Sequence, residues 1–200
     1  MRLKEGVESL GLDLPPRSIE KLENYAALIE KWNRVYNLTA IREREKIVTH
    51  HLLDSLSVLP CLAGRDFADV GSGAGLPGIV MAIARPEWEA VLIESNSKKA
   101  AFLKQVSIEL GLSNVSVFEG RVEDLKERQF DIVISRAFAE TGEFARLSMH
   151  LCRGCLAAMK GRRFEDELSN LPPGVKVESV FPLDVPGLEG KRHLVIMNLE

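Results

Sequence analysis

The chain has 200 residues, of which 46% are hydrophobic, and its formal net charge is −3. This size allows one sizeable core with a small appendage and excludes two full nucleotide-binding domains joined to a catalytic domain. The small net charge does not indicate a polyanion binder, although local basic patches remain compatible with it.

The first sixty residues have the spacing of helices. Apolar residues recur at helical intervals over Arg17–Tyr36, directly after the helix-entry pair Pro15-Pro16. The pattern repeats over Arg42–Leu59 and stops at a proline. In this second helix His51 faces inward by spacing, which favours a packed histidine over a catalytic one. We expect residues 1–62 to form a helical segment that packs on the core.

Short apolar runs alternate with amphipathic helices in the rest of the chain. The expected parallel strands are Phe67–Val70, Ala90–Ile93, Val115–Phe118, Asp131–Ile134 and Cys155–Met159. The expected helices are Gly78–Arg85, Ser97–Leu110 and Glu140–His150. Two further runs, Val175–Leu183 and His193–Leu199, predict an antiparallel closing pair. Residues 63–200 therefore predict an α/β, Rossmann-like domain with a mostly parallel seven-stranded sheet and helices on both faces, the strand inventory of class I methyltransferases.

The segment Asp69–Gly78 is rich in glycine and lies between a predicted strand and a predicted helix. Gly71, Gly73 and Gly75 permit a tight turn and let backbone N–H groups approach a ligand. The window Gly73–Gly78 also matches a dinucleotide fingerprint, so a nicotinamide-dependent oxidoreductase is an alternative. An anion at Asp69 would repel a pyrophosphate but suits the cationic sulfonium and amino group of S-adenosylmethionine. Too little chain follows for a separate substrate domain, which also favours the methyl donor.

Two acidic positions after the next strands extend this candidate cofactor site. Glu94 follows the glycine loop by about twenty residues, where a carboxylate can accept hydrogen bonds from both ribose hydroxyls. The loop after the third strand contains Val122 and Glu123, which could supply backbone contacts and an acceptor for the adenine amino group. For Val122 and Glu123 the structural alternative is a helix N-terminus, where acidic residues are enriched.

The end of the fourth predicted strand normally meets the substrate. Arg136 stands there, and a forked guanidinium suits a phosphate or guanine O6, although a helix-cap or salt-bridge arginine is the structural alternative. A ring nitrogen such as guanine N7 already has a free lone pair and needs alignment rather than a general base. Lys160–Arg163 follows the fifth strand, and further basic residues, Arg34, Arg42, Arg44 and Lys46, flank the helical segment. These could track an RNA backbone, or form a plain solvated surface with the interleaved acids.

The cysteines, the first residues and the longest apolar stretch indicate the cellular compartment and whether the protein binds a metal. Cys152 and Cys155 resemble a metal or redox pair, but they open a strand, there is no second pair, and we expect no metal. With Cys61 they are too few for a disulfide framework. Met1–Glu5 is charged, and the longest apolar stretch, Ile79–Ala84, is far below the roughly 20 residues that cross a bilayer. We expect a cytoplasmic protein without membrane contact.

Six motifs of the chain are distinctive in combination: Trp32–Thr39, His51–Leu56, Asp69–Gly78, Arg121–Glu123, Ser135–Phe138 and Met159–Gly161. Together they resemble one known family, the bacterial small-subunit ribosomal RNA guanine-N7 methyltransferases, also called glucose-inhibited division protein B. The motifs lie within roughly residues 20 to 163.

The resemblance implies methylation of one guanine in 16S rRNA with S-adenosylmethionine as donor and S-adenosylhomocysteine as product. It implies a cofactor-contacting set of Gly71, Leu76, Val122, Glu123 and Arg136, with Glu94 in the ribose-binding place. Arg136 and Lys160 would lie where the guanine approaches, and they are the candidate catalytic, substrate-positioning residues. The implied partner is 16S rRNA or a small-subunit particle, with no obligate protein partner; a non-catalytic RNA- or ribosome-binding module is the remaining alternative.

Overall fold

A computed structural model describes residues 2–162 and 164–200. Its centre is a seven-stranded sheet with the order β3-β2-β1-β4-β5-β7-β6. β1 to β5 are mutually parallel, whereas β7 runs antiparallel to both β5 and β6. The strands are β1 (Asp66–Val70), β2 (Glu89–Glu94), β3 (Val115–Glu119), β4 (Phe130–Arg136), β5 (Cys152–Lys160), β6 (Val175–Leu183) and β7 (Arg192–Leu199). The expected fold class and the antiparallel closing pair are confirmed.

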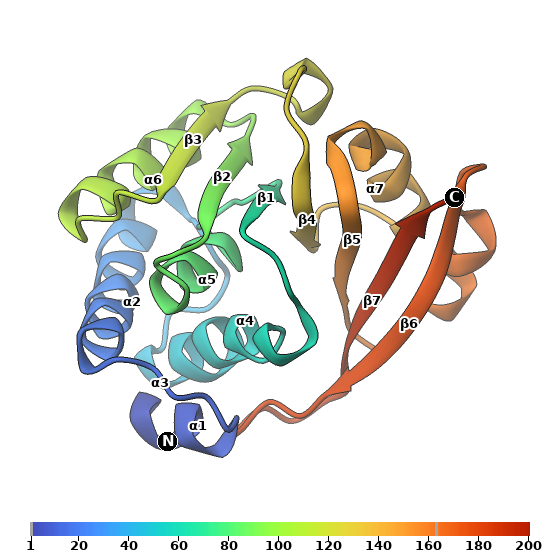
Figure 1. The fold of residues 1–200 in the computed structure, drawn as a ribbon. Coiled ribbons are helices and arrows are strands. Elements are labelled where there is room, and N and C mark those ends of the chain that lie inside the picture. The colour runs from blue at the N-terminus through green and yellow to red at the C-terminus, as the bar shows by residue number, and fades with distance from the viewer. Residues whose placement is uncertain (1, 163) are drawn as a thin grey trace.

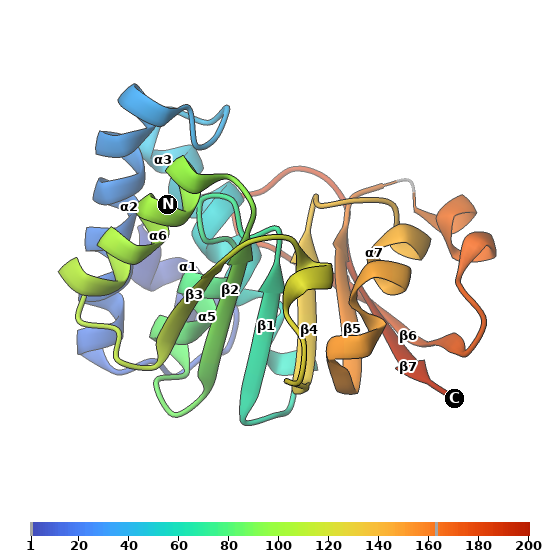
Figure 2. The same ribbon diagram turned by 90° about the horizontal axis from the view of Figure 1, so that it is seen from above.

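Helices cover both faces of this sheet (Figures 1 and 2). The longer helices are α1 (Leu3–Ser9), α2 (Pro16–Tyr36), α5 (Gly78–Ala84), α6 (Ser97–Glu109) and α7 (Thr141–Ser148). Short 3₁₀ turns occupy Leu59–Cys61, Val122–Asp124, Met149–Leu151 and Glu165–Asn170. Among the described helices, none is long and apolar enough to span a membrane.

Alternate residues of the strands enter two hydrophobic clusters, one on each face of the sheet. Phe67 of β1 belongs to the cluster that includes α1, α2, α5 and α6, whereas the next residue, Ala68, belongs to the cluster that includes α7. This alternation is expected because successive side chains of a strand point to opposite faces. The N-terminal helices, blue and cyan in Figure 1, share one continuous cluster with α5 and α6. A domain boundary after residue 62 stays a prediction.

The second predicted helix departs from regular geometry. Instead of one helix over Arg42–Leu59, the chain forms α3 (Arg44–Ile47), a π-helical turn (Val48–Leu53) and α4 (Asp54–Leu56). His51 and Leu52 are buried here, as the apolar spacing predicts. The expectation of an uninterrupted α-helix is wrong, because the N–H of Asp54 bonds to the carbonyl of Thr49, five residues earlier, and the turn is wider than an α-helical turn.

Candidate active site

The glycine loop follows β1 and turns into α5 at the carboxyl ends of the parallel strands. Gly71 has a φ of +69°, and a Cβ at this position would lie 2.4 Å from the Phe138 ring. Gly75 has a φ of +88°, and a Cβ there would lie 2.9 Å from the Tyr25 hydroxyl. Both positions therefore require glycine for backbone conformation and for space. The Tyr25 hydroxyl donates a hydrogen bond of 2.5 Å to the carbonyl of Ala74, so α2 supports the loop from behind.

Glu94 connects the glycine loop to the loop after β2. Its side chain is largely buried, and its carboxylate accepts hydrogen bonds of 2.8 Å from the N–H groups of Gly73 and Asn96. Asn96 in turn caps α6 by accepting from the N–H groups of Lys98 and Lys99. Each carboxylate oxygen can accept more than one hydrogen bond, so these contacts leave room for a ribose hydroxyl. Ribose binding by Glu94 stays a prediction.

Asp69 lies beneath the loop rather than in an open cavity. It is fully buried, and its Oδ2 accepts a hydrogen bond of 2.9 Å from the N–H of Gly78 at the start of α5. Burial raises the pKa of this carboxyl group to about 7, against the opposing effect of the Gly78 hydrogen bond. Leu76 is also buried within the larger cluster. These placements favour a role for Asp69 and Leu76 in shaping the loop; direct contact of either residue with a cofactor stays a prediction.

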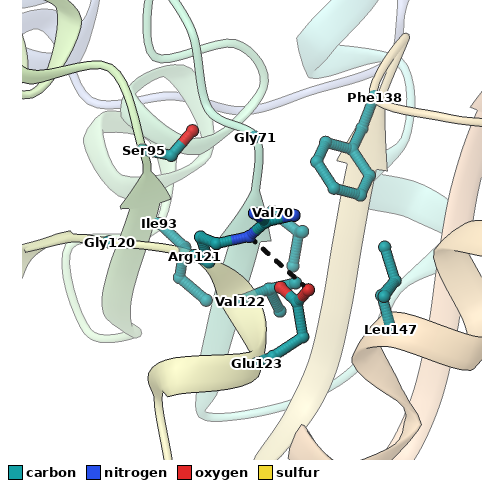
Figure 3. A pocket seen from close by; sticks show the side chains of 10 residues that line it. All are labelled: Val70, Gly71, Ile93, Ser95, Gly120, Arg121, Val122, Glu123, Phe138 and Leu147. Carbon is teal, nitrogen blue, oxygen red and sulfur yellow. Dashed lines mark ion pairs between the residues drawn. The ribbon is translucent and has the colours of Figure 1, made fainter.

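A first pocket of about 450 Å³ opens beside the loop (Figure 3). Of the predicted cofactor residues, Gly71, Val122 and Glu123 line it. Arg121 Nε lies 3.7 Å from Glu123 Oε1, and this ion pair closes one side. The sequence reasoning missed several lining residues, of which Ser95 follows Glu94 directly, Phe138 belongs to the strand-tip motif, and Leu147 on α7 has no local signal.

The chemistry of this pocket fits a nucleoside. Ile93, Val122 and Leu147 offer apolar surfaces to a flat ring, and the Glu123 carboxylate offers an acceptor for an exocyclic amino group. The absence of a Cβ at Gly71 keeps the space beside Phe138 open. The residues present therefore fit the adenosine part of S-adenosylmethionine.

A second pocket of about 480 Å³ lies between the tips of β4 and β5 and the helical segment. It contains both predicted substrate-positioning residues, Arg136 and Lys160. Residues of the segment over 41–54 form one wall, and residues at the start of β7 form another. The lining residues that were not predicted as site residues are Ile41, His50, His51, Asp54, Ala137, Met159, Gly161, Glu167, Leu183, Arg192 and His193.

Arg136 is held by the helical segment. Its Nη1 donates to Asp54 Oδ2 at 3.0 Å and to the carbonyl of His50 at 3.1 Å. Asp54 is buried, and its other oxygen lies 3.2 Å from Arg192 Nε. Arg136 lines the second pocket and is not among the described residues that line the first. The structure thus places Arg136 at the second pocket, the expected substrate side, and contact of Arg136 with the cofactor stays a prediction.

Lys160 and His51 are two further titratable groups of this pocket with well-defined partners. Lys160 Nζ donates to Glu167 at 2.6 Å and to the carbonyl of Ala139 at 3.0 Å. His51 Nε2 lies 2.8 Å from the Thr39 hydroxyl. Burial, with a further effect of the Arg136 charge, lowers the pKa of His51 to about 4, so its imidazole is neutral at pH 7. The burial of His51 agrees with the prediction of a packed histidine.

The two pockets meet at a turn after β4. Arg136 and Ala137 line the second pocket, and Phe138 lines the first. In an extended strand, residues two apart point to the same side. Ala137 instead has a φ of +55°, an uncommon conformation for a residue with a Cβ, and directs its two neighbours to different pockets. One turn therefore separates the two candidate ligand sites.

The basic residues Arg34, Arg42, Arg44 and Lys46, for which RNA contact is predicted, are not among the residues that line these pockets, and neither are the cysteines. In the helical segment, Arg34 and Lys46 form local ion pairs with Glu30 and Glu43, while Arg42 and Arg44 donate to Asn37 and to the Glu23 carbonyl. Arg163 lies outside the described residues, and RNA contact by any of these stays a prediction. Cys61, Cys152 and Cys155 are free thiols, and burial raises the pKa of the latter two to about 11. Among the described residues, no cluster could hold a metal ion.

Solved structures share this fold. The chain superposes on M. jannaschii TYW2 in complex with AdoMet with a TM-score of 0.54 and 16% identity, covering 72% of each chain. It superposes on the M1A22 tRNA methyltransferase TrmK of B. subtilis with a TM-score of 0.55 and 14% identity, covering 74% of this chain and 65% of that one. The sheet order, the glycine loop and the nucleoside-sized pocket define a class I S-adenosylmethionine-dependent methyltransferase.

The sequence narrows this class to one family. The profile of GidB, rRNA small subunit methyltransferase G, matches residues 18–195. The ribosomal RNA small subunit methyltransferase G of Nitrosospira multiformis is 50% identical to this chain, over 98% of this chain and 95% of that protein. The protein of the same name from Chromobacterium violaceum is 51% identical, over 99% of this chain and 97% of that protein. The chain belongs to the rRNA small subunit methyltransferase G family. This result confirms the resemblance and decides against the oxidoreductase and the non-catalytic RNA-binding module.

Proposed function

We propose that this protein transfers the methyl group of S-adenosylmethionine to N7 of one guanine in 16S rRNA, with Arg136 facing the guanine nucleotide. The observation that carries the proposal is the pair of pockets on either side of Ala137. The first fits a nucleoside, and the second presents a partly exposed guanidinium. Two reactants bound in these pockets would be separated by a single turn of backbone.

The residues of the second pocket suit a ring-nitrogen acceptor. Guanine N7 has an in-plane lone pair and loses no proton when it is alkylated, so alignment replaces base catalysis. His51 is neutral, but both its ring nitrogens have protein partners, the Thr39 hydroxyl and the carbonyl of His50. When bound, S-adenosylmethionine supplies an electrophilic methyl group next to a cationic sulfur. Arg136 would hold the guanine O6 or a neighbouring phosphate and so fix the ring in line.

The direct test is to incubate the protein with cofactor labelled in its methyl group and with three acceptors: 16S rRNA, intact small subunits and 23S rRNA. We expect label at N7 of one guanine in the 16S molecule, and the comparison of free RNA with subunits identifies the accepted form. Label on an exocyclic amine, or equal labelling of 23S rRNA, would contradict the proposal.

A substitution tests the role of Arg136. In Arg136→Ala we expect methyl transfer to fall by roughly 100-fold or more, while cofactor affinity changes little, because Arg136 lines the second pocket. Arg153→Ala is the matched control, since Arg153 pairs with Asp66 at the opposite end of the sheet. Unchanged transfer in Arg136→Ala would remove this residue from the site.

A further inference from the structure

The π-helical turn over Val48–Leu53 releases a backbone acceptor at the second pocket. In an α-helix the N–H of Asp54 would bond to the carbonyl of His50, four residues earlier. Here that N–H bonds to the carbonyls of Thr49 and His51 instead. The His50 carbonyl accepts from Arg136 Nη1 at 3.1 Å. The widened turn thus converts a helical carbonyl into a contact for a side chain on β4, in keeping with the frequent occurrence of π-turns at functional sites.

Asp54 completes this contact from the start of α4. Its carboxylate is 4% exposed and accepts from the same nitrogen, Arg136 Nη1, at 3.0 Å. The two acceptors therefore occupy both hydrogens of Nη1. The second terminal nitrogen lies 3.4 Å from His51 Nδ1, a long contact, and the Arg136 side chain remains 19% exposed. The donors of Nε and Nη2 are consequently available to a ligand, in the geometry that grips two oxygen atoms.

The two arginines of this pocket also depend on the Asp54 carboxylate for charge balance. Arg192 Nε lies 3.2 Å from Asp54 Oδ1, so one buried anion stands between two guanidinium groups. Lys160, the other cation that lines the pocket, is already paired with Glu167. Without Asp54 the charges of Arg136 and Arg192 would repel each other with no anion between them, and Arg136 would lose its orientation.

We propose that Asp54 is a positioning residue for methyl transfer: together with the His50 carbonyl it clamps Nη1 of Arg136, so that the Nε and Nη2 edge faces the guanine nucleotide. This inference rests on the proposed function of Arg136. It assigns a role in the reaction to the N-terminal helical segment, which lies outside the cofactor loop and the sheet.

The test compares Asp54→Asn with Asp66→Asn. Asp66 also pairs with an arginine, Arg153, but at the other end of β1, and it serves as the control for loss of a buried or half-buried carboxylate. In Asp54→Asn we expect kcat/KM for the RNA substrate to fall by roughly 10- to 100-fold, with cofactor affinity within about twofold of wild type. In Asp66→Asn both quantities should stay within about twofold of wild type.

A double-mutant cycle separates positioning from general damage. In an Arg136→Lys background, which lacks the fork, Asp54→Asn should lower kcat/KM and RNA affinity by less than about threefold further, because its effect acts through Arg136. If turnover falls below detection, the four proteins of the cycle are compared by their RNA affinity, measured by filter binding. An equal loss in both backgrounds overturns the inference. If Asp54→Asn does not fold, Asp54→Glu, which displaces the same charge by one methylene, replaces it in the cycle.

Labelling by the wild-type protein distinguishes a failure of the proposed function from a failure of the positioning role of Asp54. If the wild type labels no guanine N7, the proposed function fails, whatever Asp54 does. If the wild type labels N7 and Asp54→Asn matches it in kcat/KM, the proposed function stands and the positioning role of Asp54 is refuted.

Discussion

The contact between Gly71 and Phe138 leads to a sharp prediction for Gly71→Ala. The substitution has two costs. At a φ of +69° a residue with a Cβ is destabilised by about 1–2 kcal/mol. In addition, the new Cβ would lie 2.4 Å from the Phe138 ring, which lines the first pocket and would have to turn, at a cost of about 1–3 kcal/mol.

Gly111→Ala isolates the first cost. Gly111 follows α6 with a φ of +58°, and a Cβ there would meet no atom within 4 Å. Gly111→Ala should therefore lose roughly 2–8 °C in Tm, the equivalent of about 1–2 kcal/mol in a chain of this size. Gly71→Ala, which has both costs, should lose more, roughly 4–20 °C. Only Gly71→Ala should also lose affinity for S-adenosylhomocysteine, by about 5- to 100-fold, because only there is the pocket wall displaced.

Isothermal titration with S-adenosylhomocysteine and thermal unfolding of the same samples provide the measurements. Wild-type affinity in Gly71→Ala would refute the steric argument and the assignment of the first pocket to the cofactor. An equal loss of affinity in Gly111→Ala would show that backbone strain alone accounts for the effect.

Three further predictions concern groups that support the two pockets. In Glu94→Gln one of the two accepting oxygens becomes a donor that faces an N–H of Gly73 or Asn96, so cofactor affinity should fall by roughly 10-fold or more by titration calorimetry; wild-type affinity would remove Glu94 from the binding site. Tyr25→Phe leaves the buried Ala74 carbonyl without its donor and should cost about 1–2 kcal/mol of unfolding free energy in urea titrations, and a neutral result would mean that α2 does not support the loop. The pKa of His51 is about 4 in the folded protein and 6.5 in the unfolded chain. As the pH falls, the unfolded chain therefore binds this proton first. The stability contributed by the neutral ring is fully present above pH 6.5 and declines towards pH 4. His51→Gln should remove up to about 1.4 kcal/mol per pH unit of that decline, and an unchanged slope between pH 6.5 and 4 would contradict the shifted pKa.

The strands of the sheet could be predicted from apolar runs, but their ends could not. β5 begins at Cys152 rather than Cys155, because Cys152 pairs with Phe130 of β4 ahead of a register shift, and a side-chain pattern does not reveal pairing across such an irregularity. β4 likewise continues through Ser135, whose hydroxyl donates to the Val70 carbonyl, to Arg136, which lines the second pocket. Apolar periodicity reports burial, and strand pairing extends beyond it wherever polar residues have partners.

The glycine loop was predictable from the sequence, whereas most residues that line the two pockets were not. The glycine loop carries its own signal, since positive φ angles and close approach both demand glycine. The contact between Asp54 and Arg136 joins residues 82 apart in the chain, and no local pattern marks either as a partner of the other. The π-helical turn was not predicted either, because nearly all of its side chains are buried and no one-sided apolar pattern reveals where the turn widens.

The left-handed residue at the tip of β4 has a thermodynamic consequence. Ala137 and Phe138 are neighbours in the chain, yet they belong to the walls of different cavities. An RNA that moves Ala137 when it docks also moves Phe138 in the wall of the first pocket and must change the affinity for the methyl donor. By linkage, the methyl donor must change the affinity for RNA by the same factor. The coupling between the two reactants then depends on a single peptide unit, and its size can be measured from binding isotherms without any turnover.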